Sequence, residues 1–186
     1  VAAGVALLPL AYLVVRALDG GLGELVETLW RERTLRLTLR SLGLAATVTA
    51  ACLVIGIALA WLTTRTRLPG RTAWAVVAAL PLAVPSYVAA YTWLAAFPAI
   101  PPFVGSVLVL TLCCYPYVLL PVAAMLLRSD PALEEVARSL GRGRLATFVS
   151  VTLRQVRPGA AVGALLVALY VLSDFGAVAI LRFDVF

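Results

Sequence analysis

The sequence predicts an all-α fold, a polytopic bundle of about five membrane-spanning helices, from three observations. Hydrophobic residues make up 63% of the 186 residues and charged residues 13%, whereas a soluble domain has about 45–50% and ~25%. The mean hydropathy is +1.03. Residues 41–64 and 72–127 carry no charged side chain, and about 20 apolar residues cross the ~30 Å hydrocarbon core of a bilayer. A soluble globular fold and a disordered chain are therefore excluded.

The uncharged stretches place the spans. Residues 72–127 are long enough for two helices, and the turn between them is expected at 97–103, which contains three prolines. Proline has no backbone N–H and its ring clashes with the preceding turn, so a helix cannot continue through this segment. Residues 158–181 carry one charge, Asp174. We expect spans near residues 2–18, 41–63, 74–96, 104–127 and 159–181.

Arginine residues orient the bundle. The connection 64–73 has three arginines and no acid, 128–157 has six arginines and three acids, and the turn 97–103 is uncharged. Short arginine-rich connections stay in the cytoplasm. We therefore expect 64–73 and 128–157 inside, with the N-terminus inside and the C-terminus outside. The connection 19–40, with four arginines and four acids, would then lie outside.

The segment before the second predicted span is expected to lie on the membrane surface. Leu25 and Leu29 begin a helical repeat of leucines through residues 22–40, with charges between them, a pattern typical of a surface helix. We divide the chain into residues 1–37, the first span with this external segment, and 38–186, an incomplete transmembrane domain. Because the sequence starts inside an apolar run, we expect a piece of a longer protein, with a further span following it.

Two absent residue types exclude several functions. The sequence has no His and no Lys, so it cannot form a His-ligated metal site, a Ser-His-Asp triad or a P-loop lysine. Cys52, Cys113 and Cys114 lie in apolar runs without CxxC spacing, which favours small membrane residues over metal ligands. We expect no metal and no cofactor on this chain. The net charge of +6 suits loops beside anionic membrane lipid, and we expect no nucleic-acid partner.

The connection 128–157 is expected to form two short amphipathic helices. Asp130 suits the N-cap of the first helix and Pro131 its first position. Glu134 and Glu135 follow at its positive end, and Gly141 is placed for a left-handed residue just after its end. The apolar stripe of this helix comprises Leu133, Val136, Ala137 and Leu140.

The second of these helices is expected to end where the last span starts, at Pro158. Its apolar stripe comprises Leu145, Phe148, Val149, Thr152, Leu153 and Val156. Such stripes can lie in the groove of a partner protein, or they can rest on the membrane surface. The pattern alone leaves both interpretations open.

This connection resembles the EAA loop of ABC importer permeases. The pattern of that family is E-A-A, three residues, Gly, nine residues, and then I-x-L-P. Here Glu135, Ala137, Gly141 and Leu153 match in identity and spacing, while Arg154 stands where the family usually has Pro. Val136 and Val151 are mild replacements.

Other segments resemble the ferric-iron-type branch of the family, in which one polypeptide commonly carries two such units. They are Arg67-Leu68-Pro69-Gly70-Arg71, Leu80–Ala89, Tyr115-Pro116-Tyr117 and Ser173-Asp174-Phe175-Gly176-Ala177. The resemblance implies the permease subunit of a ferric-iron importer in the bacterial inner membrane, working by alternating access. A cytoplasmic ATP-binding cassette ATPase dimer, which holds the ATP and Mg, would dock around Glu134, Glu135, Ala137, Gly141 and Leu153. A periplasmic solute-binding protein and a second permease half would complete the importer.

Alternatives stay open within and outside this class. Thiamine, polyamine and phosphonate importers share the features that point to iron. An ion-coupled secondary carrier would use charges inside the membrane, and the single acid, Asp174, makes this class less favoured.

Four residues are candidates for the translocation pathway. Asp174 is the one charge expected inside a span, and Pro81 and Pro85 are expected to kink the third span. Tyr115 could offer a hydroxyl to a solute. Structural roles, such as a hydrogen-bonded acid or a packing kink, are the alternatives.

Overall fold

The computed structural model describes residues 31–66, 68–130 and 132–185 together with Tyr12 and Arg16. These residues form helices and connecting segments, with no strand among them. The first predicted span, residues 2–18, and most of the connection after it lie outside the described residues. The prediction of an all-α membrane bundle is confirmed for the described part of the chain.

The helices follow one another with short connections. In chain order they are α3 (Glu32–Arg65), α4 (Arg71–Ala79), η1 (Leu80–Ala83), α5 (Ser86–Ala96), α6 (Pro102–Cys114), α7 (Pro116–Arg128), α8 (Ala132–Ser139), α9 (Arg144–Thr147), η2 (Phe148–Thr152), α10 (Leu153–Ser173) and α11 (Phe175–Ile180). Here η1 is a 3₁₀ helix and η2 a π-helical stretch. Three of the described helices are long and apolar enough to cross a membrane, and a bent pair could supply a fourth crossing.

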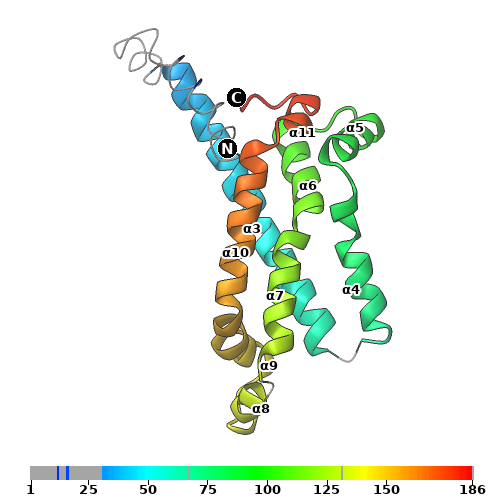
Figure 1. Ribbon diagram of the computed structural model, residues 1–186, viewed down its shortest axis with the longest axis vertical. Coiled ribbons are helices and arrows are strands. Elements are labelled where there is room, and N and C mark those ends of the chain that lie inside the picture. The colour runs from blue at the N-terminus through cyan, green and yellow to red at the C-terminus, as the bar shows by residue number, and fades with distance from the viewer. Residues whose placement is uncertain (1–11, 13–15, 17–30, 67, 131, 186) are drawn as a thin grey trace, which may run out of the picture.

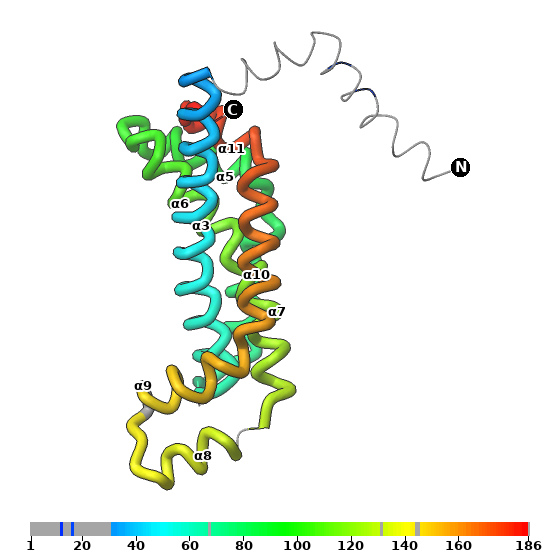
Figure 2. Tube along the Cα trace, turned by 90° about the vertical axis from the view of Figure 1, so that its left-hand side faces the viewer, coloured from blue at the N-terminus to red at the C-terminus, as the bar shows by residue number. Residues whose placement is uncertain are grey.

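The core of the bundle is formed by α3, α7 and α10, which lie side by side (Figures 1 and 2). Glycines let these helices approach closely. A Cβ atom on Gly56 of α3 would lie 2.7 Å from Cβ of Val118, and one on Gly163 of α10 would lie 2.7 Å from Cα of Val118. Val118, on α7, is fully buried between the two. Small residues at such crossings are typical of membrane helices, since packing rather than the hydrophobic effect holds them together.

The predicted surface helix before the second span is wrong for residues 32–40. These residues continue the span as one helix of 34 residues, α3, roughly 50 Å long at 1.5 Å per residue. Its charged first turn is stabilised by an exposed ion pair between Arg36 and Glu32, whose N and O atoms lie 2.7 Å apart. The i, i+4 spacing of this pair supports a helix, so the charges mark the exposed end of the span and not a separate element.

The third predicted span, residues 74–96, is broken. The helical segments Arg71–Ala83 and Ser86–Ala96 meet at an angle of 91°. Val84 and Pro85 adopt extended backbone there, because Pro85 disfavours helical geometry in the residue before it and removes a backbone donor. The kink expected from Pro81 and Pro85 is therefore a right-angle turn.

The fourth span is confirmed. A helical segment runs from Pro102 to Arg128, close to the predicted 104–127, and α6 meets α7 at Tyr115. The expected proline-rich turn precedes it, and the Ile100 N–H donates to the Phe97 carbonyl across 3.1 Å.

The last span is shifted from its predicted bounds of 159–181. It runs from Phe148 to Ser173, so the second helix of the long connection continues into the span instead of ending before it. Pro158 lies inside α10 and does not mark its start. A short separate helix, α11, follows the span, and the Ser41 hydroxyl of α3 donates a hydrogen bond to the carbonyl of Val185 beyond it.

Candidate functional site

Helix α8 projects at one end of the bundle, between α7 and the start of the last span, and α5, α11 and the C-terminus lie at the other end (Figures 1 and 2). Hydrogen bonds define both of its ends. Before its first turn, the Ala132 N–H donates to Oδ1 of Asp130 across 2.9 Å, as expected of an N-cap aspartate.

The other end of α8 closes in a Schellman motif. The Arg142 N–H donates to the Ala137 carbonyl across 3.2 Å and the Gly141 N–H to the Arg138 carbonyl across 3.0 Å. Gly141 has a φ of 81°, a left-handed conformation that glycine adopts at no steric cost and most other residues rarely adopt. The predicted left-handed turn at Gly141 is confirmed.

The two sides of α8 differ. Glu134 and Ala137 are buried against the rest of the chain, whereas Leu133, Val136 and Leu140 are 55%, 56% and 76% exposed. The expected apolar stripe is therefore divided, because Ala137 at its edge packs inward and the other three side chains remain uncovered. Glu135 is exposed as well.

A buried polar cluster holds the inner side of α8. Nε of Arg65 lies 3.4 Å from Oε1 of Glu134, and their side chains are 13% and 7% exposed. The Thr152 hydroxyl donates to the same carboxylate oxygen across 3.0 Å. Nη2 of Arg65 donates to the Ser129 carbonyl across 3.2 Å and also to the Ser129 hydroxyl. We call these four residues the Arg65–Glu134 cluster.

The cluster joins segments that are distant in sequence. Arg65 is the last residue of α3, Ser129 follows α7, Glu134 lies in α8 and Thr152 ends η2. Single π-helical turns are rare and occur frequently at functional sites. Beside the cluster, the rings of Trp61 and Phe148 pack edge to face with centroids 5.5 Å apart.

Leu153 is the last residue predicted for this site. It begins α10 and is half-buried against the hydrophobic core, and Arg154 beside it is exposed. The structure therefore separates the predicted residues into three surroundings. Glu134 and Ala137 pack inward, Glu135 and Gly141 are exposed, and Leu153 lies against the bundle.

Sequence reasoning missed Arg65 and Thr152 as partners of Glu134, and Ser129 as a partner of Arg65. Arg65 was counted only as a loop charge and Thr152 only as part of an apolar stripe. The Thr152 hydroxyl in the otherwise apolar stripe of the second helix is the one sequence feature that indicates a polar neighbour at this position.

The candidate pathway residues do not form one site. Pro81 and Tyr115 line the same apolar groove, about 390 Å³ in volume, whereas Pro85 and Asp174 do not line it. The prediction placed Asp174 inside the last span, but that span ends at Ser173. Asp174 is instead the N-cap of α11, where its Oδ1 accepts a hydrogen bond from the Ala177 N–H across 3.0 Å. Its Oδ2 is buried without a hydrogen-bond partner in the described structure.

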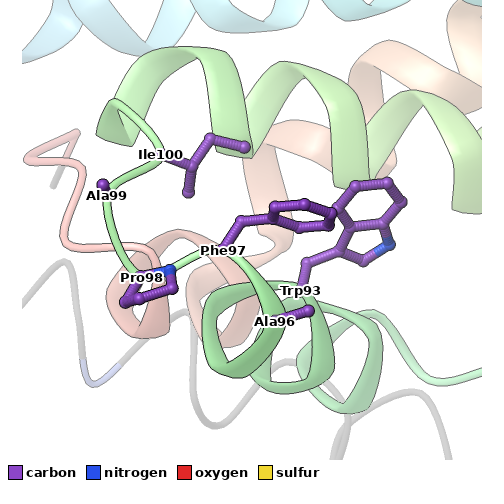
Figure 3. A pocket seen from close by; sticks show the side chains of 6 residues that line it. All are labelled: Trp93, Ala96, Phe97, Pro98, Ala99 and Ile100. Carbon is purple, nitrogen blue, oxygen red and sulfur yellow. The ribbon is translucent and has the colours of Figure 1, made fainter.

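An apolar hollow of about 480 Å³ lies at the α5 end of the bundle, on the last turn of α5 and the proline-containing turn that follows it (Figure 3). Its lining residues are Trp93, Ala96, Phe97, Pro98, Ala99 and Ile100. The rings of Trp93 and Phe97 stack with centroids 5.5 Å apart. No charged side chain lines this hollow, and within the described chain no group of three or more Asp, Glu, Cys or His side chains is placed to hold a metal ion.

The described chain is a multi-helix membrane bundle with a capped amphipathic helix projecting from one end, and the family comparison shows its class, the membrane-embedded subunits of transport systems. Residues 52–182 match the family described as the binding-protein-dependent transport system inner membrane component. The chain belongs to this family, and the resemblance to ABC importer permeases is confirmed.

Named relatives support this assignment. The chain is 36% identical over 179 residues to the Fe(3+)-transport system permease protein FbpB 2 of Haemophilus influenzae, covering 96% of this chain and 35% of FbpB 2. It is 32% identical over 140 residues to the sulfate transport system permease protein CysT of Escherichia coli, covering 67% of this chain and 50% of CysT. It is 30% identical over 156 residues to the molybdenum transport system permease protein ModB of Escherichia coli, covering 75% of this chain and 68% of ModB. The chain thus spans about a third of the length of FbpB 2 and half that of CysT.

Proposed function

We propose that this chain is the first membrane unit of a two-unit ABC importer permease and that α8 docks on a partner ATPase. The exposed side chains Leu133, Val136 and Leu140 carry this proposal. They form an apolar stripe on a helix that is capped at both ends and held on its other side. Such a stripe fits a hydrophobic groove on a partner protein.

The charge distribution supports a cytoplasmic location for α8. Arg65 and Arg71 flank the connection between α3 and α4, at the same end of the bundle as α8, and arginine-rich connections stay on the cytoplasmic side. The ATPase would supply ATP hydrolysis with bound Mg, since this sequence has no lysine for a P-loop. A binding protein would deliver solute at the α5 end, and alternating access would release it inside.

The solute we propose is ferric iron. FbpB 2 is named for Fe(3+) transport and is 36% identical to this chain, which supports iron over the other solutes. The sulfate and molybdenum permeases are 28–33% identical to it, and one sulfate permease covers as much of the chain as FbpB 2 does. An oxyanion importer is the second candidate on that observation.

The experiment is recovery of the full-length permease from its own membranes in detergent, with identification of the soluble proteins bound to it. We expect an ATP-binding cassette protein with the wild type and several-fold less of it with Val136→Ser/Leu140→Ser. The matched control is Arg138→Ser, which places the same polar residue on another side of α8, and it should retain the ATPase. Equal recovery with both variants would contradict docking through the stripe, and no ATPase with any form would contradict the importer assignment.

A further inference from the structure

Two neighbouring glutamates on α8 have opposite surroundings. The Glu134 side chain is 7% exposed and contacts two residues of the bundle, whereas Glu135 is exposed. The family motif contains Glu135 and not Glu134, so the motif does not explain why a carboxylate is buried one residue earlier. Burial of a charge without a partner is costly, and each buried carboxylate therefore needs its own explanation.

The contacts of Glu134 join the ends of two core helices directly, α3 and α10, and reach a third, α7, through Arg65. Arg65 ends α3, and Thr152 lies immediately before α10. Both reach the same carboxylate oxygen, Oε1 of Glu134, at 3.4 and 3.0 Å. Through Ser129, Arg65 also contacts the end of α7. One carboxylate thus links α8 to all three helices of the core.

Few other side chains attach α8 to the bundle. Its buried residues are Glu134 and Ala137, and a methyl group gives little directional restraint. The hydrogen bond from Thr152 restrains the direction of the Glu134 carboxylate. Attraction to the Arg65 guanidinium, whose Nε makes no hydrogen bond of its own, keeps the carboxylate at this site, so the two contacts together can specify one arrangement where apolar contacts would allow several. The position of α8 relative to the core therefore depends on Glu134.

We propose that Glu134 is a positioning residue that fixes α8 to the α3–α7–α10 core through Arg65 and Thr152. A displacement of α8 by the partner ATPase is then passed to these three helices and is not absorbed by bending of the connections on either side of α8. This role rests on the proposed function, because it presumes that α8 receives such a displacement.

The first test needs no transport activity. Amide hydrogen exchange of residues 132–140 would be measured in the full-length permease in detergent, for wild type, Glu134→Gln and Glu135→Gln. We expect exchange at least about tenfold faster in Glu134→Gln, since local opening of α8 becomes easier, and unchanged exchange in Glu135→Gln. Equal exchange in both variants would overturn the positioning role.

The double variant Arg65→Gln/Glu134→Gln separates positioning from general damage. Each single variant leaves one buried charge unpaired, whereas the double variant leaves none and should fold as well as or better than either. We expect the thermal midpoint of the double variant to be closer to the wild-type value than that of either single variant. The amides of α8 should still exchange faster than in the wild type. If the α8 amides of the double variant exchange as slowly as those of the wild type, the proposal is overturned, because α8 would then be held without the ion pair.

The second test measures coupling in the complete importer, reconstituted in liposomes with ATPase and binding protein. The readout is iron taken up per ATP hydrolysed. We expect a fall of several-fold in Glu134→Gln with the ATPase still bound, and partial loss in Thr152→Val, which removes the hydrogen bond without stranding a charge. Arg71→Gln, an exposed arginine at the same end, is the matched control for Arg65→Gln and should keep the wild-type ratio.

The two tests distinguish failure of this inference from failure of the proposed function. If the wild type binds no ATPase, the importer assignment fails while the exchange result still decides whether Glu134 positions α8. If the wild type transports iron and Glu134→Gln keeps an unchanged ratio of iron to ATP, the importer assignment holds and the positioning role is overturned.

Discussion

The two ends of the bundle are held together by different chemistry. At the α8 end, Arg65 and Glu134 form a buried ion pair among the ends of several helices. At the α5 end there is no buried ion pair among the described residues, and the contacts are mainly apolar and aromatic, as between the tilted rings of Phe103 and Phe183, whose centroids lie 5.4 Å apart, beside a hydrogen bond from Ser41 to the Val185 carbonyl. The Thr152 hydroxyl adds a directional hydrogen bond to Glu134, whereas apolar contacts are non-directional and allow small displacements. This difference is what the proposed role of Glu134 requires, because a displacement of α8 can reach the core only if α8 is fixed to it.

Between these ends, the central contacts of α7 should be the most sensitive to substitution. Gly163→Ala would place Cβ 2.7 Å from Cα of Val118 and 2.9 Å from the carbonyl of Tyr117. Backbone atoms cannot move aside cheaply, so we expect a loss of about 1–3 kcal/mol in stability, as for other overpacked cores. The thermal midpoint of the purified permease measures this loss.

The control for that substitution is Gly43→Ala, because a Cβ atom at Gly43 would meet nothing within 4 Å. We expect an unchanged or slightly raised thermal midpoint, since alanine favours a helix more than glycine does. Equal destabilisation by both changes would show that close packing on Val118 does not hold the core together.

At the α8 end, Gly141→Val should damage coupling while the protein still inserts in the membrane. The φ of 81° disfavours any side chain by about 1–2 kcal/mol, although a Cβ atom there would meet no neighbour within 4 Å. Gly141→Asn should retain more activity than Gly141→Val, because asparagine tolerates this conformation. ATPase recovery and iron uptake, measured on equal amounts of permease, check both variants, and equal activity of the two would exclude backbone strain as the cause.

A more local effect is expected from Thr152→Val, which leaves Oε1 of Glu134 with one partner fewer. Loss of a hydrogen bond to a charged group costs about 1.5–3 kcal/mol when the group stays buried. We expect the loss to appear as faster hydrogen exchange of α8 more than as unfolding of the bundle. Thr147→Val offers a comparison, since the buried Thr147 hydroxyl has no hydrogen-bond partner in the described structure, and its removal should cost little.

The smallest effect on stability is expected near the other end, at Asp174. Asp174→Asn keeps an oxygen that can accept from the Ala177 N–H, so α11 should stay capped, whereas Asp174→Ala should lose about 0.5–2 kcal/mol. If the carboxylate lines the pathway, Asp174→Asn lowers uptake at unchanged stability. Full uptake with Asp174→Asn, together with lower stability for Asp174→Ala, would assign the residue to capping alone.

Local sequence patterns predicted local structure well in this chain. Gly141 as a left-handed residue and Asp130 as a cap both follow from interactions within one helical turn, and the span ending at Arg128 follows from a long uncharged run. The break between Ala83 and Ser86 was expected only as a kink, since proline spacing does not give a bend angle.

Contacts between distant residues could not be predicted in the same way. Arg65, Glu134 and Thr152 meet only because α3, α8 and α10 end at the same place, and no periodicity relates their positions. The continuation of α10 through Pro158 was missed for a related reason. Neighbouring helices support a proline inside a membrane helix, and their positions are not visible in the local sequence.

The most direct test of the account is footprinting of the assembled importer with and without its ATPase. Amide hydrogen exchange would be followed in residues 132–142 at the α8 end and in residues 93–100 at the α5 end. The account predicts strong protection of 132–142 by the ATPase and no protection of 93–100. Unchanged exchange across 132–142 in a complex that contains the ATPase would contradict docking on α8.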